Sequence, residues 1–242
     1  MTDRRHSLGR RWFGEFAVVF LGVALALVAD DYRERRSETR EVRETLRVVA
    51  ADLHADSLEF VDVGERMTSH AEAADWLITR WDEELDPDSV VSALTAFSSR
   101  TALQLNSSAF QGLRNANRLH LLGSDTLRSE LSDYYQKRHA ALEDFNGVES
   151  QLRERLIFER LAPYVRNLPG AEDGLWPPVT PPLELRTRWR EAAEDPALHS
   201  EILWLGRNAD YLVEFLADGE VRAGALRTLI FEFLGDDPPP SS

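Results

Sequence analysis

The chain has 242 residues, contains no cysteine and carries a net charge of −14, with 42 acidic against 28 basic side chains. The missing cysteines exclude disulfides, thiolate metal sites and cysteine nucleophiles, and the acidity disfavours non-specific binding to nucleic acid. A hydrophobic fraction of 43% and a charged fraction of 29% predict one well-solvated domain with a real core, preceded by an N-terminal segment of different composition.

That first segment has the pattern of a membrane-spanning helix. A basic tail, residues 1–11, precedes an unbroken apolar run over residues 16–29. Taken as residues 12–32, the segment would be roughly 31 Å long as a helix, which matches the hydrocarbon thickness of a bilayer. Aromatic and basic residues at both ends suit the two membrane surfaces. The expected interfacial anchors are Arg10, Arg11, Trp12 and Tyr32.

Small residues recur on one face of the predicted span. Gly22 and Ala26 are four residues apart and Ala29 lies near the same face, a spacing that permits close contact between helices in a bilayer. Glu15 follows Arg11 by one turn, so that the two charges can neutralise each other at the interface. We therefore expect Glu15, Gly22, Ala26 and Ala29 to form the contact with other membrane helices.

Other interpretations of this segment stay open. A basic tail and an apolar run ending in Ala24-Leu25-Ala26 or Leu27-Val28-Ala29 would also suit a cleaved signal peptide, whereas a core helix fits the unpatterned run less well. The count of basic residues near the two ends favours a cytoplasmic domain, but the net positive tail favours the opposite orientation. We expect a cytoplasmic N-terminus and a periplasmic domain at the bacterial inner membrane.

Residues 33–85 are predicted to form one long amphipathic helix that continues the span. Glu and Arg interleaved over residues 30–47 favour a self-supporting stalk. Gly64 leaves a kink open, and Asp86-Pro87 is expected to end the helix. Apolar positions recur in steps of three and four, the signature of one apolar stripe. The stripe comprises Val42, Leu46, Val49, Leu53, Phe60, Val63, Met67, Ala71, Ala74, Leu77 or Ile78, and Trp81.

The rest of the domain also reads as helical. Residues 86–162 are predicted to form a helical bundle in which Gly123 ends one helix and a single long helix follows from about residue 125 to 161, with Tyr134-Tyr135 packed in the core. Residues 183–235 are expected to supply two or three further helices. One covers about residues 184–194, a second runs from the N-cap pair Asp195-Pro196 to about residue 217, and a last one covers about residues 221–234. The tail, residues 236–242, is expected to be disordered. Expected caps in the bundle are Asp88 or Ser89, Ser107 or Ser108, and Ser124 or Asp125.

Between these helical regions lies a proline-rich loop, residues 163–182, which holds Trp176, Pro177 and Pro178. A loop of that length in a small domain is often functional, which favours a docking element at these three residues. The equal alternative is that Trp176 pins the loop to the core. The predicted fold is therefore all-α: a transmembrane helix, a long stalk helix and an extramembrane bundle with one proline-rich loop.

No motif points to catalysis, to a cofactor or to a metal site. The chain lacks phosphate-binding glycine loops, nucleophile elbows and paired histidines at metal-ligand spacing, and His70 with Glu72 would need further ligands. Asp52, Asp56 and Asp62 are expected on a solvated acidic face of the long helix. We therefore predict a protein that is not an enzyme.

Two segments resemble an uncharacterised family of bacterial single-pass membrane proteins. Their span carries a glutamate near its start and a glycine within it, and ends in an Asn/Asp-rich exit before an aromatic and charged helix. A second match is an aromatic-x-x-Leu segment, a small residue, a Leu-rich turn and Tyr-Tyr; the family often has Gly where Ala116 stands here. The resemblance implies the architecture and no mechanism. The matching residues are Glu15, Gly22, Ala26, Asp30-Asp31-Tyr32, Glu34-Arg35-Arg36, Phe110, Leu113, Leu119, Leu122, Asp125, Leu127-Arg128, Leu131 and Tyr134-Tyr135.

Three functional hypotheses follow. The first is a non-enzymatic accessory or scaffold subunit of a larger membrane complex, for example a respiratory, transport or photosynthetic one, which binds other membrane proteins and the lipid bilayer but no nucleic acid. The second is a homo-oligomer in which the stripe Val42–Trp81 forms a coiled coil. The third is a membrane-anchored ligand sensor or enzyme, which would require a buried cluster of titratable side chains.

Overall fold

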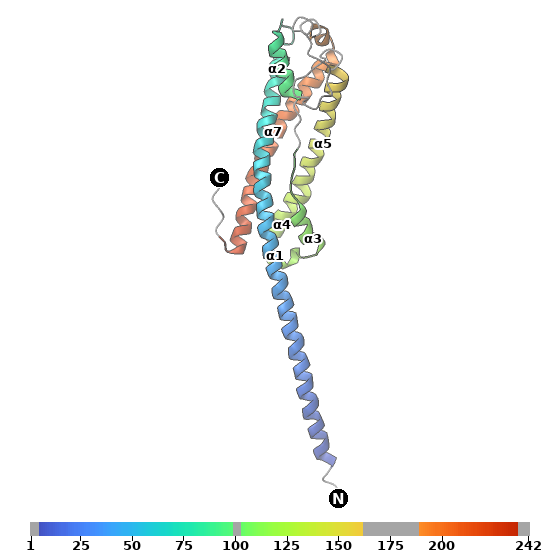
Figure 1. Ribbon diagram of the computed structural model, residues 1–242, viewed down its shortest axis with the longest axis vertical. Coiled ribbons are helices and arrows are strands. Elements are labelled where there is room, and N and C mark those ends of the chain that lie inside the picture. Colours follow the sequence, from blue (N-terminus) through green and yellow to red (C-terminus); the bar gives the residue numbers. More distant parts are fainter. Residues whose placement is uncertain (1–4, 99–102, 162–188, 237–242) are drawn as a thin grey trace.

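The computed structural model describes residues 5–98, 103–161 and 189–236, with the side chains of the first helix described from residue 20 onward. Every regular element in these ranges is helical, as the sequence predicts. The longest, α1 (Arg5–Thr79), runs as one helix of 75 residues and continues through Gly64 without a break. The second longest is α7 (Pro196–Leu234), with 39 residues. Figure 1 shows α1 and α7 side by side along the bundle, with α1 extending far beyond it toward the N-terminus.

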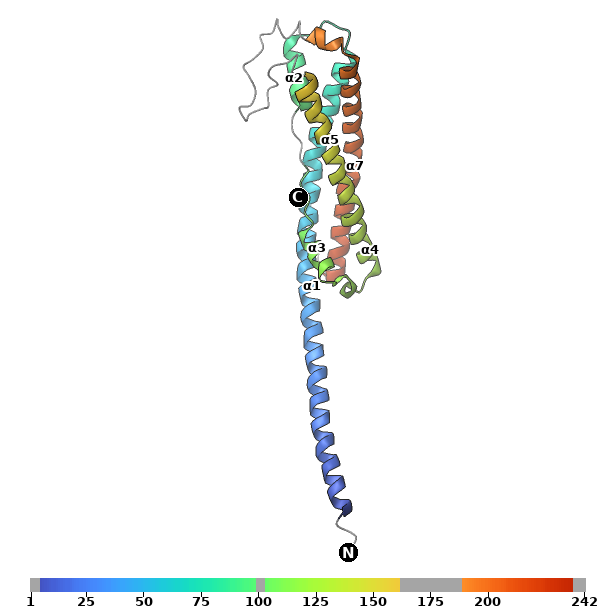
Figure 2. The ribbon, with the colours of Figure 1, turned by 90° about the vertical axis from the view of Figure 1, so that its right-hand side faces the viewer.

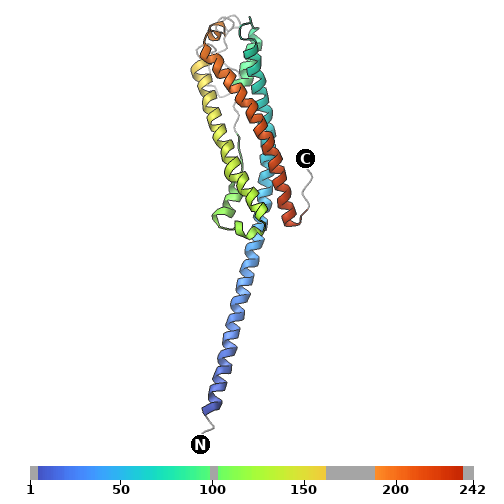
Figure 3. The ribbon, with the colours of Figure 1, turned by 180° about the vertical axis from the view of Figure 1, so that it is seen from behind.

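Shorter elements complete the bundle. They are α2 (Pro87–Ser98), α3 (Ser108–Asn115), η1 (Leu119–Leu122), α4 (Asp125–Asp133), η2 (Tyr134–Arg138), α5 (His139–Arg155) and η3 (Leu156–Leu161); residues 189–193 are also helical. The three views agree that α5 packs along α1 and α7, while α3 and α4 close the end of the bundle from which α1 emerges (Figure 2 and Figure 3).

The predicted stripe of α1 forms the centre of the core. Leu46, Leu53 and Leu77 have no exposed surface, and Phe60 and Met67 are almost as fully buried. Their partners come mainly from α7, whose buried residues also recur in steps of three and four. Burial of a large apolar side chain contributes about 1.5–3 kcal/mol, so this seam supplies much of the stability. We call residues 42–77 the embedded part of α1 and residues 21–40 the projecting part.

Two glycines of α7 allow the two long helices to approach each other. A Cβ atom on Gly206 would lie 2.6 Å from the Cβ of Ala74, and one on Gly219 would lie 3.1 Å from Cε2 of Phe60. The sequence predicted a helix boundary near residues 217–221, and that prediction is wrong. Gly219 lies inside α7, where its missing side chain makes room for the Phe60 ring.

Local signals place several helix ends. Ser124 caps α4 by accepting a hydrogen bond from the Leu127 amide at 3.2 Å, and Asp195 caps α7 by accepting one from the Ala197 amide at 2.9 Å. Gly123 has a left-handed backbone with φ +63, as the prediction of a helix end there requires. These expectations are confirmed because caps depend on neighbouring residues alone.

Two helices differ from the sequence prediction, one in its end and the other in its regularity. The first helix ends at Thr79 rather than near residue 85, because Trp81 turns toward the far end of the bundle, where its Nε1 donates to the Ala193 carbonyl at 2.9 Å. The single helix expected from about residue 125 to 161 contains two π-helical turns, at Tyr134–Arg138 and Leu156–Leu161. A π-turn inserts an extra residue and changes which side chains face the core.

Candidate functional site

The projecting part of α1 is the first candidate for a functional surface. Its large apolar side chains are exposed. No other described helix lies beside it in any view (Figure 1, Figure 2 and Figure 3). An apolar collar of this kind on a single helix is the mark of an interaction surface. The residues are Leu21, Val23, Leu25, Leu27 and Val28, between 55% and 67% exposed.

The residues predicted to pack in the membrane lie partly within this collar. Gly22, Ala26 and Ala29 are exposed, and a Cβ atom on Gly22 would have nothing within 4 Å. Tyr32 is 64% exposed. The face therefore has no partner within the described part of the chain. The side chains of Glu15, Arg10, Arg11 and Trp12 lie outside the described residues, as do Trp176, Pro177 and Pro178 of the predicted docking loop.

Among the residues searched, which are the described ones, no helix is long and apolar enough to cross a membrane. The predicted span, residues 12–32, lies partly outside that description, since its side chains are described only from residue 20.

A basic hollow lies directly above the collar. Tyr32, Thr39 and four arginines line a concave surface of about 550 Å³ on α1, and no acidic residue is among its lining residues. Arg43 at its upper end donates to the Leu234 carbonyl at the end of α7. The hollow therefore marks the level at which α1 enters the bundle. The four arginines are Arg35, Arg36, Arg40 and Arg43.

A buried polar cluster lies inside the bundle around Asp56. Its carboxylate has no exposed surface and accepts hydrogen bonds from the backbone N–H of Asn106 and from the Tyr134 hydroxyl, both at 2.9 Å. His139 Nε2 lies 3.7 Å from the same carboxylate. Asp56 thus links α1 to the chain before α3 and to η2. The prediction of a solvated acidic face is wrong for Asp56. The apolar stripe makes a step of seven residues from Leu53 to Phe60, and Asp56 occupies the core-facing position between them.

The phenols beside Asp56 are held in the neutral form. Burial raises the pKa of Tyr134, and the Asp56 charge raises it further through space and as acceptor of its hydrogen bond. Burial and the same carboxylate also raise the pKa of Tyr135, whose ring stacks on Phe110 with centroids 4.6 Å apart. Burial, followed by the Asp56 charge, raises the pKa of Asp52. Core packing of the two tyrosines is confirmed. The hydrogen bonds of the cluster hold α1, η2 and the chain before α3 together.

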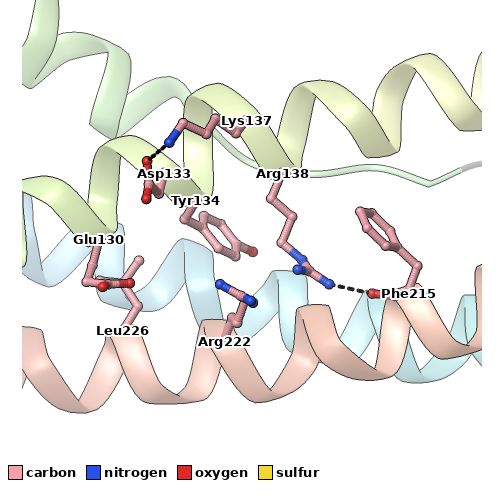
Figure 4. Close-up of a pocket in the computed structure, with 8 residues that line it drawn as sticks. All are labelled: Glu130, Asp133, Tyr134, Lys137, Arg138, Phe215, Arg222 and Leu226. Carbon is pink, nitrogen blue, oxygen red and sulfur yellow. Dashed lines mark hydrogen bonds and ion pairs between the residues drawn. The ribbon is translucent and has the colours of Figure 1, made fainter.

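A pocket of about 220 Å³ opens beside this cluster, between η2 and α7 (Figure 4). Arg138 crosses it, donating to the Phe215 carbonyl at 2.6 Å and to the Asp218 carboxylate, with its guanidinium 4.5 Å from the centre of the Phe215 ring. Burial opposes a low pKa at Asp218, but hydrogen bonds from Arg138 and Arg222 lower it. The bonds of Arg138 to the Phe215 carbonyl and to Asp218 therefore join η2 to α7 across this pocket.

A second buried polar group lies nearer the far end of α1. His70 has no exposed surface, and Glu149 and Arg153 form a buried ion pair on α5. Burial lowers the pKa of His70 to about 3, with Arg153 and Arg66 adding to the shift. Glu72 is exposed, so the two residues of the His-x-Glu pair point into different surroundings. The searched part of the chain contains no group of three His, Asp or Glu placed to hold a metal ion.

The geometry changes one functional hypothesis. Val49 and Leu53, which were expected to face a second chain in a coiled coil, have no exposed surface because α7 and the chain's other helices cover them. The hypothesis that the stripe Val42–Trp81 forms a coiled coil with a second chain is therefore wrong. The cluster around Asp56 is the kind of group that a ligand sensor would need, but both carboxylate oxygens are taken up by bonds within the chain.

No family model, no curated protein and no solved structure matches the chain. The resemblance to the uncharacterised single-pass family stays a prediction.

Proposed function

We propose that this protein is a membrane-anchored, non-enzymatic interaction subunit, in which α1 serves both as the anchor and as the central helix of the extramembrane bundle. The observation that carries the proposal is the apolar collar of the projecting part, which has no covering element among the described residues and continues directly into the core helix. Transfer of its five large apolar side chains out of water would contribute on the order of 10 kcal/mol.

Features next to the collar support the same arrangement. Tyr32 and the arginines of the basic hollow follow it within about one to four turns, where a membrane surface favours aromatic and cationic groups. Since α1 has no break between the collar and Val42, a rigid helical segment would connect the bundle to the membrane. The predicted span, residues 12–32, would then be the membrane helix.

Anchoring can be tested with the full chain expressed in a bacterium. Membranes are washed with alkaline carbonate, and we expect the protein to remain in the pellet. The double variant Val23→Arg/Leu25→Arg should move it to the supernatant, because each arginine in the hydrocarbon region costs about 2.5–3.5 kcal/mol. Val221→Arg is the matched control, since Val221 is an exposed valine of the bundle, and it should stay in the pellet. Release of the unaltered protein by carbonate would refute the anchor.

We propose further that the subunit belongs to a larger membrane complex. Two exposed aromatic side chains of the bundle, Trp204 and Tyr211, are two turns apart on α7 and are 45% and 57% exposed. Exposed aromatic residues are typical anchors of protein interfaces. Extraction in mild detergent, followed by mass spectrometry, should recover the protein in fixed stoichiometry with other membrane proteins, and Trp204→Ala should reduce that recovery. Isolation only as a monomer or homodimer would contradict the proposal.

The orientation of the bundle can be decided with the same preparation. Because the chain has no cysteine, a single Ser129→Cys substitution on α4 gives a unique exposed thiol. We propose a cytoplasmic N-terminus, so a membrane-impermeant maleimide should label this thiol in cells with a permeabilised outer membrane. Labelling only after lysis of the inner membrane would reverse the orientation and leave the anchor in place.

A further inference from the structure

The part of α1 that leads from the collar into the bundle carries its charges on two opposite sides. Over residues 30–44, acidic and basic residues are interleaved in sequence, but successive residues of an α-helix are about 100° apart around its axis. The residues that line the basic hollow, from Tyr32 to Arg43, therefore fall within about 140° of the helix surface, with Arg33 at the border. The six acidic residues are centred on the opposite side: Asp30, Asp31, Glu34, Glu38, Glu41 and Glu44.

Contacts with the bundle agree with this separation. On the basic side, Arg43 donates to the Leu234 carbonyl, so the end of α7 lies there. On the acidic side, Glu41 pairs with Arg118 at 2.6 Å. Residues 30–43 contain five acidic and five basic side chains and are neutral as a whole. Their net charge would therefore not attract an anion, whereas the hollow on one side of the helix would.

Two arginines of the hollow are available for an outside anion. Arg35 pairs with Asp31 at 3.0 Å, and Arg43 is bound to the end of α7. Arg36 and Arg40 are exposed, and neither has an ion pair or a hydrogen bond to any residue that the structure describes. The two lie one turn apart, where like charges repel each other. An anion bound between them would remove that repulsion.

The hollow also lies at the height of a lipid headgroup. If residues 12–32 are the membrane helix, Tyr32 marks the edge of the hydrocarbon. At 1.5 Å per residue, Arg36 lies about 6 Å and Arg40 about 12 Å beyond it along α1. The headgroup layer is about 5–8 Å thick on each side of the bilayer. Side chains of an α-helix lean toward its N-terminus, here toward the membrane, so that both long arginine side chains can reach this layer.

We infer that Arg36 and Arg40 bind the phosphate group of an anionic phospholipid in the leaflet next to the bundle. The inference rests on the proposed membrane anchor, which brings the hollow to the bilayer surface. Guanidinium groups bind phosphate oxygens through paired, charge-assisted hydrogen bonds. An anionic lipid is preferred because a zwitterionic headgroup carries its own cation beside the phosphate. The bound lipid fixes the height of the bundle, since Arg43, less than one turn beyond Arg40, holds the end of α7.

Native mass spectrometry of the full chain tests this lipid site. The protein is titrated in detergent micelles with phosphatidylglycerol, which is anionic, and with phosphatidylcholine, which is zwitterionic. We expect preferential binding of phosphatidylglycerol. Arg36→Gln should lower its apparent affinity about fivefold, and the double variant Arg36→Gln/Arg40→Gln by more than tenfold, since each arginine near a membrane surface contributes a similar attraction to anionic lipid.

Arg114→Gln is the matched control. Arg114 is an exposed arginine of α3, which closes the end of the bundle from which α1 emerges, but it is not among the residues that line the hollow. The substitution removes the same charge at the same end of the bundle and should lower the affinity less than twofold. Equal binding of the two lipids by the unaltered protein, or equal losses in Arg36→Gln and Arg114→Gln, would overturn the lipid site.

Two further results would assign the hollow to another anion. If inorganic phosphate displaces phosphatidylglycerol and its own binding is lost in Arg36→Gln, the occupant is a soluble phosphate. If Arg36→Gln leaves lipid binding unchanged but loses co-purifying proteins in mild detergent, the occupant is an acidic partner protein. Either result overturns the inference.

A carbonate wash of the same variants separates this inference from the anchor. Arg36→Gln/Arg40→Gln should remain in the membrane pellet, because the apolar collar is unchanged. A protein that resists carbonate but shows no preference for phosphatidylglycerol overturns the lipid site and leaves the anchor intact. Release of the unaltered protein by carbonate refutes the anchor and the lipid site with it.

Discussion

The projecting and embedded parts of α1 belong to one helix but expose their apolar side chains in opposite ways. In the projecting part, Leu25 and Leu27 are each 66% exposed, although they lie in an unbroken apolar run. In the embedded part, Leu46 and Leu53 have no exposed surface, although charged residues surround them in sequence. A helix that is apolar on all sides would leave apolar surface exposed to water in this bundle. One apolar stripe is enough to pack a helix against its neighbours. The pattern of the apolar residues, more than their number, distinguishes the projecting part of α1 from the embedded part.

The largest effect should come from equal truncations in the two parts. Leu53→Ala leaves a cavity in the core and should lower the free energy of unfolding by about 2–5 kcal/mol. Leu25→Ala in the projecting part should change it by less than about 0.5 kcal/mol, because the bundle does not contact this side chain. Urea unfolding in detergent, followed by circular dichroism, measures both. Similar losses in the two variants would mean that the projecting part packs on the bundle.

A second comparison sets a buried carboxylate against an exposed one on the same helix. Asp56→Ala removes the acceptor for the Tyr134 hydroxyl and the Asn106 amide and should cost roughly 1–3 kcal/mol of stability. Asp62→Ala removes an exposed ion pair with Arg66 and should cost less than about 1 kcal/mol. Thermal unfolding of the two variants measures the difference. An equal loss of stability would mean that the hydrogen bonds of Asp56 do not hold α1, η2 and the chain before α3 together.

The embedded part should also respond to pH through His70. Its pKa is lowered to about 3 in the folded chain, so the unfolded chain binds the proton first as pH falls through its ordinary value of 6.5. The stabilisation from neutral His70 is complete above that value and is lost progressively toward pH 3, by roughly 1 kcal/mol at pH 6. His70→Leu should remove this slope, and the exposed His120→Gln should keep it. Denaturation midpoints between pH 8 and 5 give the slopes; identical slopes in all three proteins would exclude His70 as the cause.

The smallest effect is expected at the boundary between the two parts. Arg47 pairs with Asp236 just beyond the end of α7, and both side chains are partly exposed. Arg47→Ala should lower the free energy of unfolding by less than about 1 kcal/mol, and high salt should have a similar effect on the unaltered protein. A larger loss, measured by urea unfolding, would place the end of the bundle lower on α1.

Some features of the bundle could be read from local sequence, and others could not. The stripe of α1 and the caps at Ser124 and Asp195 depend on spacing and on neighbouring residues, so these predictions are confirmed. Asp56 and His70 were missed, although each occupies a position in the three-four rhythm of the stripe. A polar residue in such a position is buried when a partner elsewhere in the fold bonds it, and the Tyr134 hydroxyl is 78 residues away.

The sequence by itself determined that the chain is helical, which face of α1 is apolar and where several helices begin, because these follow from periodicity and from groups within a few residues of each other. Only the tertiary structure decided that α7 is one helix through Gly219, that α1 ends at Thr79 just before Trp81 bonds the helix of residues 189–193, and that Asp56 is buried. Each of these depends on how closely two distant segments approach, which neither propensity nor spacing along the chain specifies.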